Sequence, residues 1–436
     1  MSEPLKIAVA GLGTIGGGTL KLLHDNAEIL RQRCGRELVV TAICDVREEM
    51  AAAWPNITWY DDALRMVAET DAEVIVELIG GSDGIAKKLC EAAIDAGKHV
   101  VTANKAMIAH HGTALVRAAE AKGTTIAFEA AVAGGIPIIK AMREALVGNN
   151  ITRVYGILNG TCNYILTTMR ETGREFDDVL AEAQALGYAE ADPSFDVDGV
   201  DAAHKLAILT SLAFGCEIDF DAVHIEGIRH VTAQDIKFAE ELNYRIKLLG
   251  IARRTETGIE QRVHPCMVPL ANPIAHVDGV FNAVVADGDF VDTTMYEGRG
   301  AGERPTASAV VADIVDVARG HTVPVLGVPS SELKPFVVSP MDKRKGSYCI
   351  RLMVRDEPGV FAEIATVLRD CQVSMEAVLQ KGHAPNEAVP VVLTTHETRE
   401  ASMTKALEMI EALDMVIEPP RMIRIQSFQT GAGGGE

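Results

Sequence analysis

The segment from residue 185 to residue 209 holds the densest group of side chains that can exchange protons. Its only lysine, Lys205, follows Asp201 by four residues, so on a helix both side chains would project from one face. The apolar run after Lys205 predicts a largely buried helix, and burial lowers the pKa of a lysine toward neutrality, where acid–base catalysis is efficient. The same spacing is also that of an ordinary surface ion pair, so the residues alone leave both interpretations open.

The carboxylates around this pair do not have the spacing of a calcium-binding loop. Counted from Asp196, the fifth position is Val200 and the twelfth is Ala207, and neither side chain carries a ligand oxygen. The eight cysteines are scattered without a Cys-x-x-Cys pair, which predicts buried thiols rather than a zinc site or a redox dithiol. The carboxylates of the segment are Glu190, Asp192, Asp196, Asp198 and Asp201.

A glycine-rich loop lies near the start of the chain, where the β-rich run of residues 6–11 leads into a helix. Its Gly-x-Gly-x-x-Gly spacing permits a tight turn, close backbone approach to a pyrophosphate, and tight packing of the following helix, whose N–H groups face the anion. The motif is weak alone, but its place after the first strand of a βαβ series predicts dinucleotide binding. The loop residues expected at the cofactor are Gly11, Leu12, Gly13, Thr14, Ile15 and Gly16.

The end of the second predicted strand carries two side chains that make opposite predictions about the cofactor. Asp45 could accept a hydrogen bond from the 2′-hydroxyl of an NAD ribose. Arg47 could instead pair with the 2′-phosphate of NADP, or it could be an ordinary solvated helix residue. The choice between NAD and NADP therefore stays open.

These groups need elements that position them, and the first 130 residues alternate β-rich runs with helical stretches. The alternation predicts an α/β fold with a Rossmann-type, doubly wound parallel sheet. A helical stretch at 306–320 could return to this sheet, so the predicted dinucleotide domain comprises residues 1–130 and about 306–328. Residues 131–305 form a predicted α+β domain with helical stretches at 201–215 and 232–254. The strands of the first domain are expected within 6–11, 38–45, 72–81, 98–105 and 124–130.

The pattern of the C-terminal part predicts a separate domain. A Pro- and Lys-rich linker is predicted at 329–346, and a strand-helix-strand-strand-helix-strand order follows over 347–427. Within it, the Pro-Gly turn of residues 356–360 offers free N–H groups at a helix start, which could hold the carboxylate of an amino acid. Residues 428–436 are a predicted flexible tail.

Composition limits the possible partners. The chain has 436 residues, 48% of them apolar and 23% charged, which excludes wholesale disorder and allows about three domains. Its net charge of −20 would repel nucleic acid and anionic membranes. No secretory signal and no run of about eighteen apolar residues occurs, so a cytoplasmic protein is expected.

Several motifs in the expected order resemble the homoserine dehydrogenase family. They are residues 101–105 (VTANK), 128–137 (FEAAVAGGIP), 156–164 (GILNGTCNY), 185–205 and 300–308 (GAGERPTAS), and the resemblance spans residues 5 to about 320. It implies NAD(P)-dependent interconversion of L-homoserine and L-aspartate 4-semialdehyde, with Lys205 as general acid and base.

The resemblance also implies further site residues. Asp201 and Glu190 would hold the substrate, and Lys105, Gly187, Glu190 and Gly302 would line the cofactor. A monovalent cation, sodium, would bind mostly backbone carbonyls of Glu129, Val132, Gly134 and Ile136. Residues 347–427 resemble a ferredoxin-like ACT domain, which implies an amino-acid effector, with threonine as the natural candidate, and a homo-oligomer.

Two other kinds of protein compete with this interpretation. One is a related Rossmann semialdehyde reductase or an acylating aldehyde dehydrogenase, for which Cys162 is the only cysteine within a motif. The other is a non-catalytic amino-acid sensor. The retained Asp201 and Lys205 pair argues against the sensor.

Overall fold

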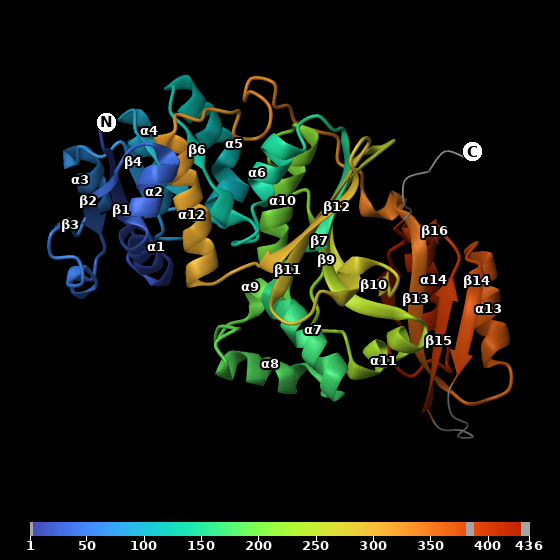
Figure 1. Ribbon diagram of the computed structural model, residues 1–436. Helices are drawn as coiled ribbons and strands as arrows, with labels where there is room; N and C mark the ends of the chain where they lie inside the picture. Colours follow the sequence, from blue (N-terminus) through green and yellow to red (C-terminus); the bar gives the residue numbers. More distant parts are fainter. Residues whose placement is uncertain (1–2, 381–387, 429–436) are drawn as a thin grey trace.

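The computed structural model describes residues 3–380 and 388–428. Figure 1 shows the N-terminal sheet and its helices at one end of the molecule, a second sheet in the middle, and the C-terminal strands and helices at the other end. The predicted tail lies outside the described residues from position 429 onward. No helix of the described residues is both long and apolar enough to cross a membrane.

The N-terminal sheet has six parallel strands in the order β3-β2-β1-β4-β5-β6, which confirms the Rossmann-type fold. The short strand β3 is absent from the sequence prediction, because three residues are too few to give a periodic signal. The strands are β1 (Leu5–Ala10), β2 (Leu38–Cys44), β3 (Thr58–Tyr60), β4 (Val74–Glu77), β5 (His99–Thr102) and β6 (Ile126–Ala127).

Helices cover both faces of this sheet. Helix α12 (Glu303–Ala318) packs against α1 (Thr14–Asp25), and its Val310 and Ile314 are buried in the same apolar cluster as Val9 of β1. A segment almost three hundred residues downstream therefore covers the helix that follows the glycine-rich loop. The other helices are α2 (Ala27–Cys34), α3 (Ala63–Glu69), α4 (Ile85–Asp95) and α5 (Lys105–Ala121), with a 3-10 turn η1 (Glu48–Ala51).

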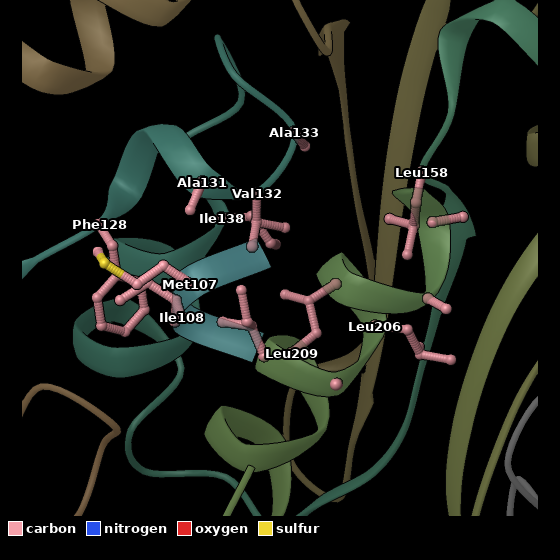
Figure 2. Close-up of a cluster of buried hydrophobic side chains, with 14 of the residues drawn as sticks. Met107, Ile108, Phe128, Ala131, Val132, Ala133, Ile138, Leu158, Leu206 and Leu209 are labelled. Carbon is pink, nitrogen blue, oxygen red and sulfur yellow. The ribbon is translucent and has the colours of Figure 1, made fainter. Parts of the chain in front are cut away.

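The middle part contains the helix that carries Lys205. This helix, α10 (Val200–Phe214), packs against α5 and against β7 (Ile151–Ile157), β9 (Tyr244–Thr255) and β10 (Gly258–Pro269). Figure 2 shows Leu209 of α10 on the side of Ile108 and Val132, and Leu206 on the side of Leu158, and all five belong to one buried apolar cluster. Apolar contacts on several sides thus fix the position of α10 along its axis and its rotation about that axis.

The remaining elements of the middle part complete its sheet and its helical cover. The strands are β8 (His224–Ile225), β11 (Phe281–Gly288) and β12 (Asp292–Arg299). The helices are α6 (Ile138–Lys140), α7 (Gly160–Thr172), α8 (Phe176–Ala185), α9 (Ser194–Val197) and α11 (Ala233–Glu241), with the short helical turns η2 (Glu129–Ala131), η3 (Ala141–Ala145) and η4 (Pro273–His276).

One sequence prediction in this part is wrong. The stretch 232–254 was expected to be helical throughout, but α11 ends at Glu241 and the rest forms β9. Asn243 has a φ of 63°, which breaks the helix, and β9 then pairs along its length with β10. A short apolar run is compatible with the helical period and with the strand period, and here hydrogen bonding to β7 and β10 stabilises the strand.

The C-terminal elements follow the predicted order, and their sheet has the strand order β17-β13-β15-β14. The last strand, β17, also pairs in parallel with β10, so the middle and C-terminal strands form one continuous sheet of eleven strands. The elements are η5 (Met341–Lys343), β13 (Lys345–Arg355), α13 (Val360–Asp370), β14 (Met375–Gln380), β15 (Ala388–Thr395), β16 (Thr398–Arg399), α14 (Glu400–Glu411) and β17 (Arg421–Ile425).

Candidate active site

Lys205 lies on the first turns of α10 with only 6% of its surface exposed. Its Nζ donates one hydrogen bond to the carbonyl of Leu158 at 2.7 Å and another to Oδ2 of Asp201 at 2.8 Å. Asp201 and Lys205 therefore lie on one face of α10, as predicted, and their ion pair is buried rather than on the surface. Two of the three ammonium donors are occupied by these contacts, which leaves one for a further acceptor.

A second lysine reaches the same carboxylate. The Nζ of Lys105 lies 2.9 Å from Oδ1 of Asp201 and 5.6 Å from the ring centre of Phe195. Lys105 begins α5 directly after β5, and Asn104 caps this helix by accepting the backbone N–H of Met107. The family resemblance implies that Lys105 lines the cofactor, and this stays a prediction. In the structure its ammonium contacts Asp201, at the edge where the parallel strands end.

Burial and charge act in opposite directions on these three groups. Burial lowers the pKa of Lys205, the negative charge of Asp201 opposes this, and the ammonium of Lys105 adds to the lowering. Burial would raise the pKa of Asp201, but the two ammonium groups outweigh it and keep the carboxylate ionised. The charge of Asp201 raises the pKa of Lys105. Lys205 is therefore the group of the three that is suited to lose and regain a proton.

The other carboxylates of the segment lie in different surroundings. Asp196 is close to Asp201, because the side-chain amide of Asn159 donates to both, and burial raises the pKa of Asp196. Glu190 is exposed, and its charge contributes to the raised pKa of Lys105. Asp192 accepts the backbone N–H of Ser194, and Asp198 pairs with Arg229. These two carboxylates therefore stabilise the conformation of the loop.

Asn159 could not be singled out from the sequence, where it is one residue of the 156–164 motif. An asparagine between a strand and a helix usually indicates only a helix cap. The structure adds that its amide donates to two carboxylates from a distant segment, Asp196 and Asp201.

The glycine-rich loop has the shape that a bound dinucleotide needs. A Cβ atom on Gly16 would lie 1.9 Å from the carbonyl oxygen of Gly11, and one on Gly11 would lie 2.5 Å from the carbonyl oxygen of Leu78. These two glycines therefore allow close packing of helix on strand. A Cβ on Gly13 would meet nothing within 4 Å, so space is free where the N-terminus of α1 opens, beside Thr14 and Ile15. The residues present fit a pyrophosphate at this helix start.

Asp45 and Arg47 form an ion pair beside this loop. Asp45 accepts the backbone N–H of Leu12 at 2.8 Å, and Arg47 donates from Nε to Oδ1 of Asp45 at 3.0 Å. Burial would raise the pKa of Asp45, but these hydrogen bonds and the arginine charge lower it. The Arg47 side chain is 51% exposed, so it is accessible to a ligand.

The loop predicted to bind a cation packs against the turn that contains Gly302. Gly135 donates its N–H to the carbonyl of Arg299, and a Cβ on Gly134 would lie 2.6 Å from the carbonyl oxygen of Gly300. The carboxylate of Glu129 accepts the N–H groups of Ile139 and Lys140, each at 2.9 Å. Burial raises the pKa of Glu129 to about 7, and the neighbouring charge of Asp313 adds to the rise.

The other predicted cofactor and cation residues occupy turns. Gly187 and Gly302 are exposed and have φ values of 75° and 115°. Ala133 and Gly134 are consecutive residues with positive φ, between Val132 and Ile136. The roles of these residues stay predictions.

Cys162 does not have the properties of a catalytic nucleophile. It is fully buried, and its thiol donates to the backbone carbonyl of Asp196 at 3.2 Å. Burial raises its pKa well above the usual value, whereas a nucleophilic cysteine needs a stabilised thiolate. The geometry therefore argues against the acylating mechanism.

Comparison with known proteins gives a consistent result. Residues 11–129 match the family model described as homoserine dehydrogenase, NAD binding domain, and residues 137–315 match the model described as homoserine dehydrogenase. The chain is 49% identical over 433 residues to the homoserine dehydrogenase of Neisseria gonorrhoeae, covering 98% of this chain and 99% of that protein. It is 47% identical to that of Pseudomonas aeruginosa, covering 98% and 100%.

Solved structures agree with the sequence comparisons. The crystal structure of a homoserine dehydrogenase from Thiobacillus denitrificans is 48% identical with a TM-score of 0.92 and covers 97% of this chain and 98% of that one. A hyperthermophilic archaeal homoserine dehydrogenase in complex with NADPH is 29% identical with a TM-score of 0.63 and covers 73% and 99%. The chain therefore belongs to the homoserine dehydrogenase family and is an oxidoreductase with an NAD(P)-binding domain.

Proposed function

We propose that the enzyme reversibly oxidises L-homoserine to L-aspartate 4-semialdehyde at the site around Lys205. The observation that carries this proposal is the buried lysine of lowered pKa, held by Leu158 and Asp201. Through Lys105, which follows β5, Asp201 also contacts the edge of the parallel sheet that carries the glycine-rich loop. The residues of the glycine-rich loop would hold a nicotinamide cofactor, which would supply the hydride acceptor for oxidation and the hydride donor for reduction. Every other requirement falls on residues of this chain.

Lys205 acts as the proton-transfer group. In its neutral form it takes the hydroxyl proton of homoserine, and in the reverse direction the ammonium returns it. The carbonyl of Leu158 and the carboxylate of Asp201 orient its nitrogen. Glu190 and Asp201 anchor the substrate ammonium. Oδ1 of Asp201 accepts only from Lys105 among the contacts of the described residues, so it retains acceptor capacity for that purpose.

The charge of Lys105 gives a test through pH dependence. Because its ammonium lowers the pKa of Lys205, Lys105→Met should raise that pKa. Neutral Lys205 is the form that accepts the proton, so the rise of kcat/KM for homoserine oxidation should move to higher pH. The measurement is the pH profile of kcat/KM, with Lys122→Met as control, since Lys122 forms an exposed pair with Asp95. No shift, or a shift to lower pH, would contradict the assignment.

We also propose that the cofactor preference depends on the Asp45–Arg47 pair. An NADP 2′-phosphate would draw the exposed guanidinium away from Asp45, whereas an NAD ribose would donate its 2′-hydroxyl to the carboxylate. Both arrangements use side chains that already lie beside the loop. The ratio of the rates with the two cofactors distinguishes them.

A monovalent cation, sodium, is the proposed ligand of the turn from Glu129 to Ile136. The support is the left-handed backbone of Ala133 and Gly134 and the close packing of this turn on residues 299–302. Backbone carbonyls can replace the hydration shell of such an ion. Comparing turnover in sodium chloride with turnover in tetramethylammonium chloride tests the site.

The C-terminal unit is the proposed regulatory domain, of the ACT type, with threonine as its effector. Its support is the ferredoxin-like strand order and a buried connection to the middle part. Arg424 donates to Glu226 at 2.6 and 2.8 Å and also pairs with Glu400. Two residues after Glu226, the N–H of Ile228 donates to Val197, next to Asp196. These contacts connect the C-terminal unit with the segment that precedes Asp201, and regulation by the effector would act through them.

A point variant tests this regulation better than removal of the domain, since removal would strip β17 from β10. We expect Gly359→Ala, in the turn before α13, to weaken inhibition by threonine and to leave turnover without threonine unchanged. Gly359 has a φ of 101°, so a Cβ there would strain the turn whose N–H groups would hold the effector. Glu408→Ala, on the exposed face of α14, is the control. Unchanged inhibition in Gly359→Ala would place the effector site elsewhere.

We further infer a cytoplasmic homo-oligomer. The strands β12 and β14 end the eleven-stranded sheet, and an end strand can pair with another copy of the chain. All eight cysteines are free and buried, as expected in a reducing compartment. Light scattering of the purified protein measures the oligomer size.

A further inference from the structure

Asn159 connects three parts of the candidate active site through one side chain. It follows β7 and precedes α7, and only 4% of its surface is exposed. Its Oδ1 accepts the backbone N–H of Cys162 at 2.8 Å, which caps α7. Its Nδ2 donates to Oδ1 of Asp196 at 2.7 Å and to Oδ2 of Asp201 at 2.8 Å. All the polar atoms of the side chain are therefore engaged.

The chemistry of these partners fixes the orientation of the amide. Two carboxylates can only accept, so the NH₂ group must face them, and the backbone N–H of Cys162 can only donate, so the amide oxygen must face it. A neutral side chain with two donors is needed at this point, because Asp196 and Asp201 repel one another. Burial, together with this repulsion, raises the pKa of Asp196.

The backbone next to Asn159 acts on the other half of the ion pair. The carbonyl of Leu158 accepts from Nζ of Lys205, while the side chain of Asn159 holds the oxygen of Asp201 that faces the same Nζ. Gly160 lets this segment pack closely against the backbone of Val280, since a Cβ there would lie 2.7 Å from the carbonyl oxygen of Val280. Two consecutive residues therefore orient both the lysine and its carboxylate.

We propose that Asn159 is a positioning residue, which sets the geometry of the Asp201–Lys205 pair and keeps Asp196 and Asp201 ionised side by side. It acts through these groups and not on the substrate. The inference rests on the proposed reaction at Lys205 and adds a residue to it. It predicts that the amide donors matter to catalysis, beyond the capping of α7.

Two substitutions separate the capping role from the positioning role. Asn159→Asp and Asn159→Ser both keep an oxygen that can cap α7, and both lose the amide NH₂ group that donates to the two carboxylates. Serine offers at most one O–H donor, on a shorter side chain, in its place. Asn159→Asp also places a third negative charge beside Asp196 and Asp201, which should raise the pKa of Lys205 because negative charge favours its ammonium form. Asn159→Ser adds no charge.

The control is Asn163→Ser in the same helix. Asn163 is also buried, but it donates to the carbonyls of Val277 and Phe281 and accepts from Lys247, away from the carboxylates of the site. Its replacement should lower stability without moving the pKa of Lys205. Thermal unfolding of all the variants identifies losses that come from the fold alone.

The first readout is steady-state homoserine oxidation across pH. We expect Asn159→Asp to lose about 10²-fold in kcat with a smaller change in KM, as for misplacement of a reacting group by about 1 Å. The rise of its pH profile should move to higher pH, and Asn159→Ser should lose kcat without that upward shift. Equal kcat, KM and pH profiles in Asn159→Asp and the wild type would overturn the proposal.

The second readout needs no substrate, so it distinguishes failure of this inference from failure of the proposed reaction. The pKa of Lys205 is measured by NMR on protein with ¹³Cε-labelled lysine, with the resonance assigned by its loss in Lys205→Met. Asn159→Asp should raise this pKa and Asn163→Ser should not. An unchanged pKa in Asn159→Asp would overturn the positioning role even if homoserine is a substrate. A wild type inert toward homoserine would instead contradict the proposed reaction.

Discussion

Lys205→Ala is expected to lose about three orders of magnitude in turnover while it binds the cofactor almost as tightly as the wild type. The loss is that of a positioned proton-transfer group, which contributes typically 10²–10⁴-fold. Binding should persist, because the glycine-rich loop and the Asp45–Arg47 pair lie on other elements than α10. Lys205→Met, which fills more of the buried space, should show the same loss.

The two halves of this prediction have separate measurements. Initial rates of homoserine oxidation give the turnover. Cofactor affinity can be followed by tryptophan fluorescence, since the two tryptophans, Trp54 and Trp59, line one hollow beside η1 and Trp59 donates to the carbonyl of Asp45. Near-native turnover in Lys205→Met would refute the role of Lys205, and a matching loss of cofactor affinity would assign the defect to binding.

Asp201→Asn is expected to damage both stability and catalysis. The wild-type carboxylate is 3% exposed and lies between the ammonium groups of Lys105 and Lys205, so its removal leaves two positive charges close together without compensation. Breaking a buried ion pair in this way costs about 3–5 kcal/mol. Loss of the negative charge should also lower the pKa of Lys205 further, so the remaining activity should rise at lower pH than in the wild type.

Urea unfolding and the pH profile of kcat/KM measure these two effects. Asp198→Asn is the control, because Asp198 forms an ion pair with Arg229 in which both side chains are more than a third exposed. Loss of such a pair should cost about 1 kcal/mol or less. Equal free energies of unfolding for the two variants would show that the site around Asp201 is not the buried triad described above.

The N-terminal sheet could be predicted from the sequence because its signals are local. Each long strand is an apolar run bounded by helical stretches, and the glycine-rich loop marks the first crossing from strand to helix. The strand β3 of this sheet was missed because it has only three residues. In the second sheet, β9 was predicted as helix because its apolar run fits the helical period as well as the strand period. In both cases neighbouring strands decide the conformation.

The candidate site was predictable only in part, for a similar reason. The four-residue spacing brings Asp201 and Lys205 together on any helix. The contacts of Asp201 with Lys105 and Asn159 cross 96 and 42 residues of chain, and no local pattern encodes them. Likewise, the linker at 329–346 suggested an independent C-terminal unit, whereas β17 extends the middle sheet by pairing with β10.

The most direct test is the appearance of reduced nicotinamide absorbance when purified protein is mixed with L-homoserine and either NAD or NADP. We expect that absorbance grows with at least one cofactor, that L-aspartate 4-semialdehyde drives the reverse change, and that Lys205→Met suppresses both. A flat trace with both cofactors, in sodium- and in potassium-containing buffer, would contradict the proposed reaction. It would favour a related reductase or an amino-acid sensor.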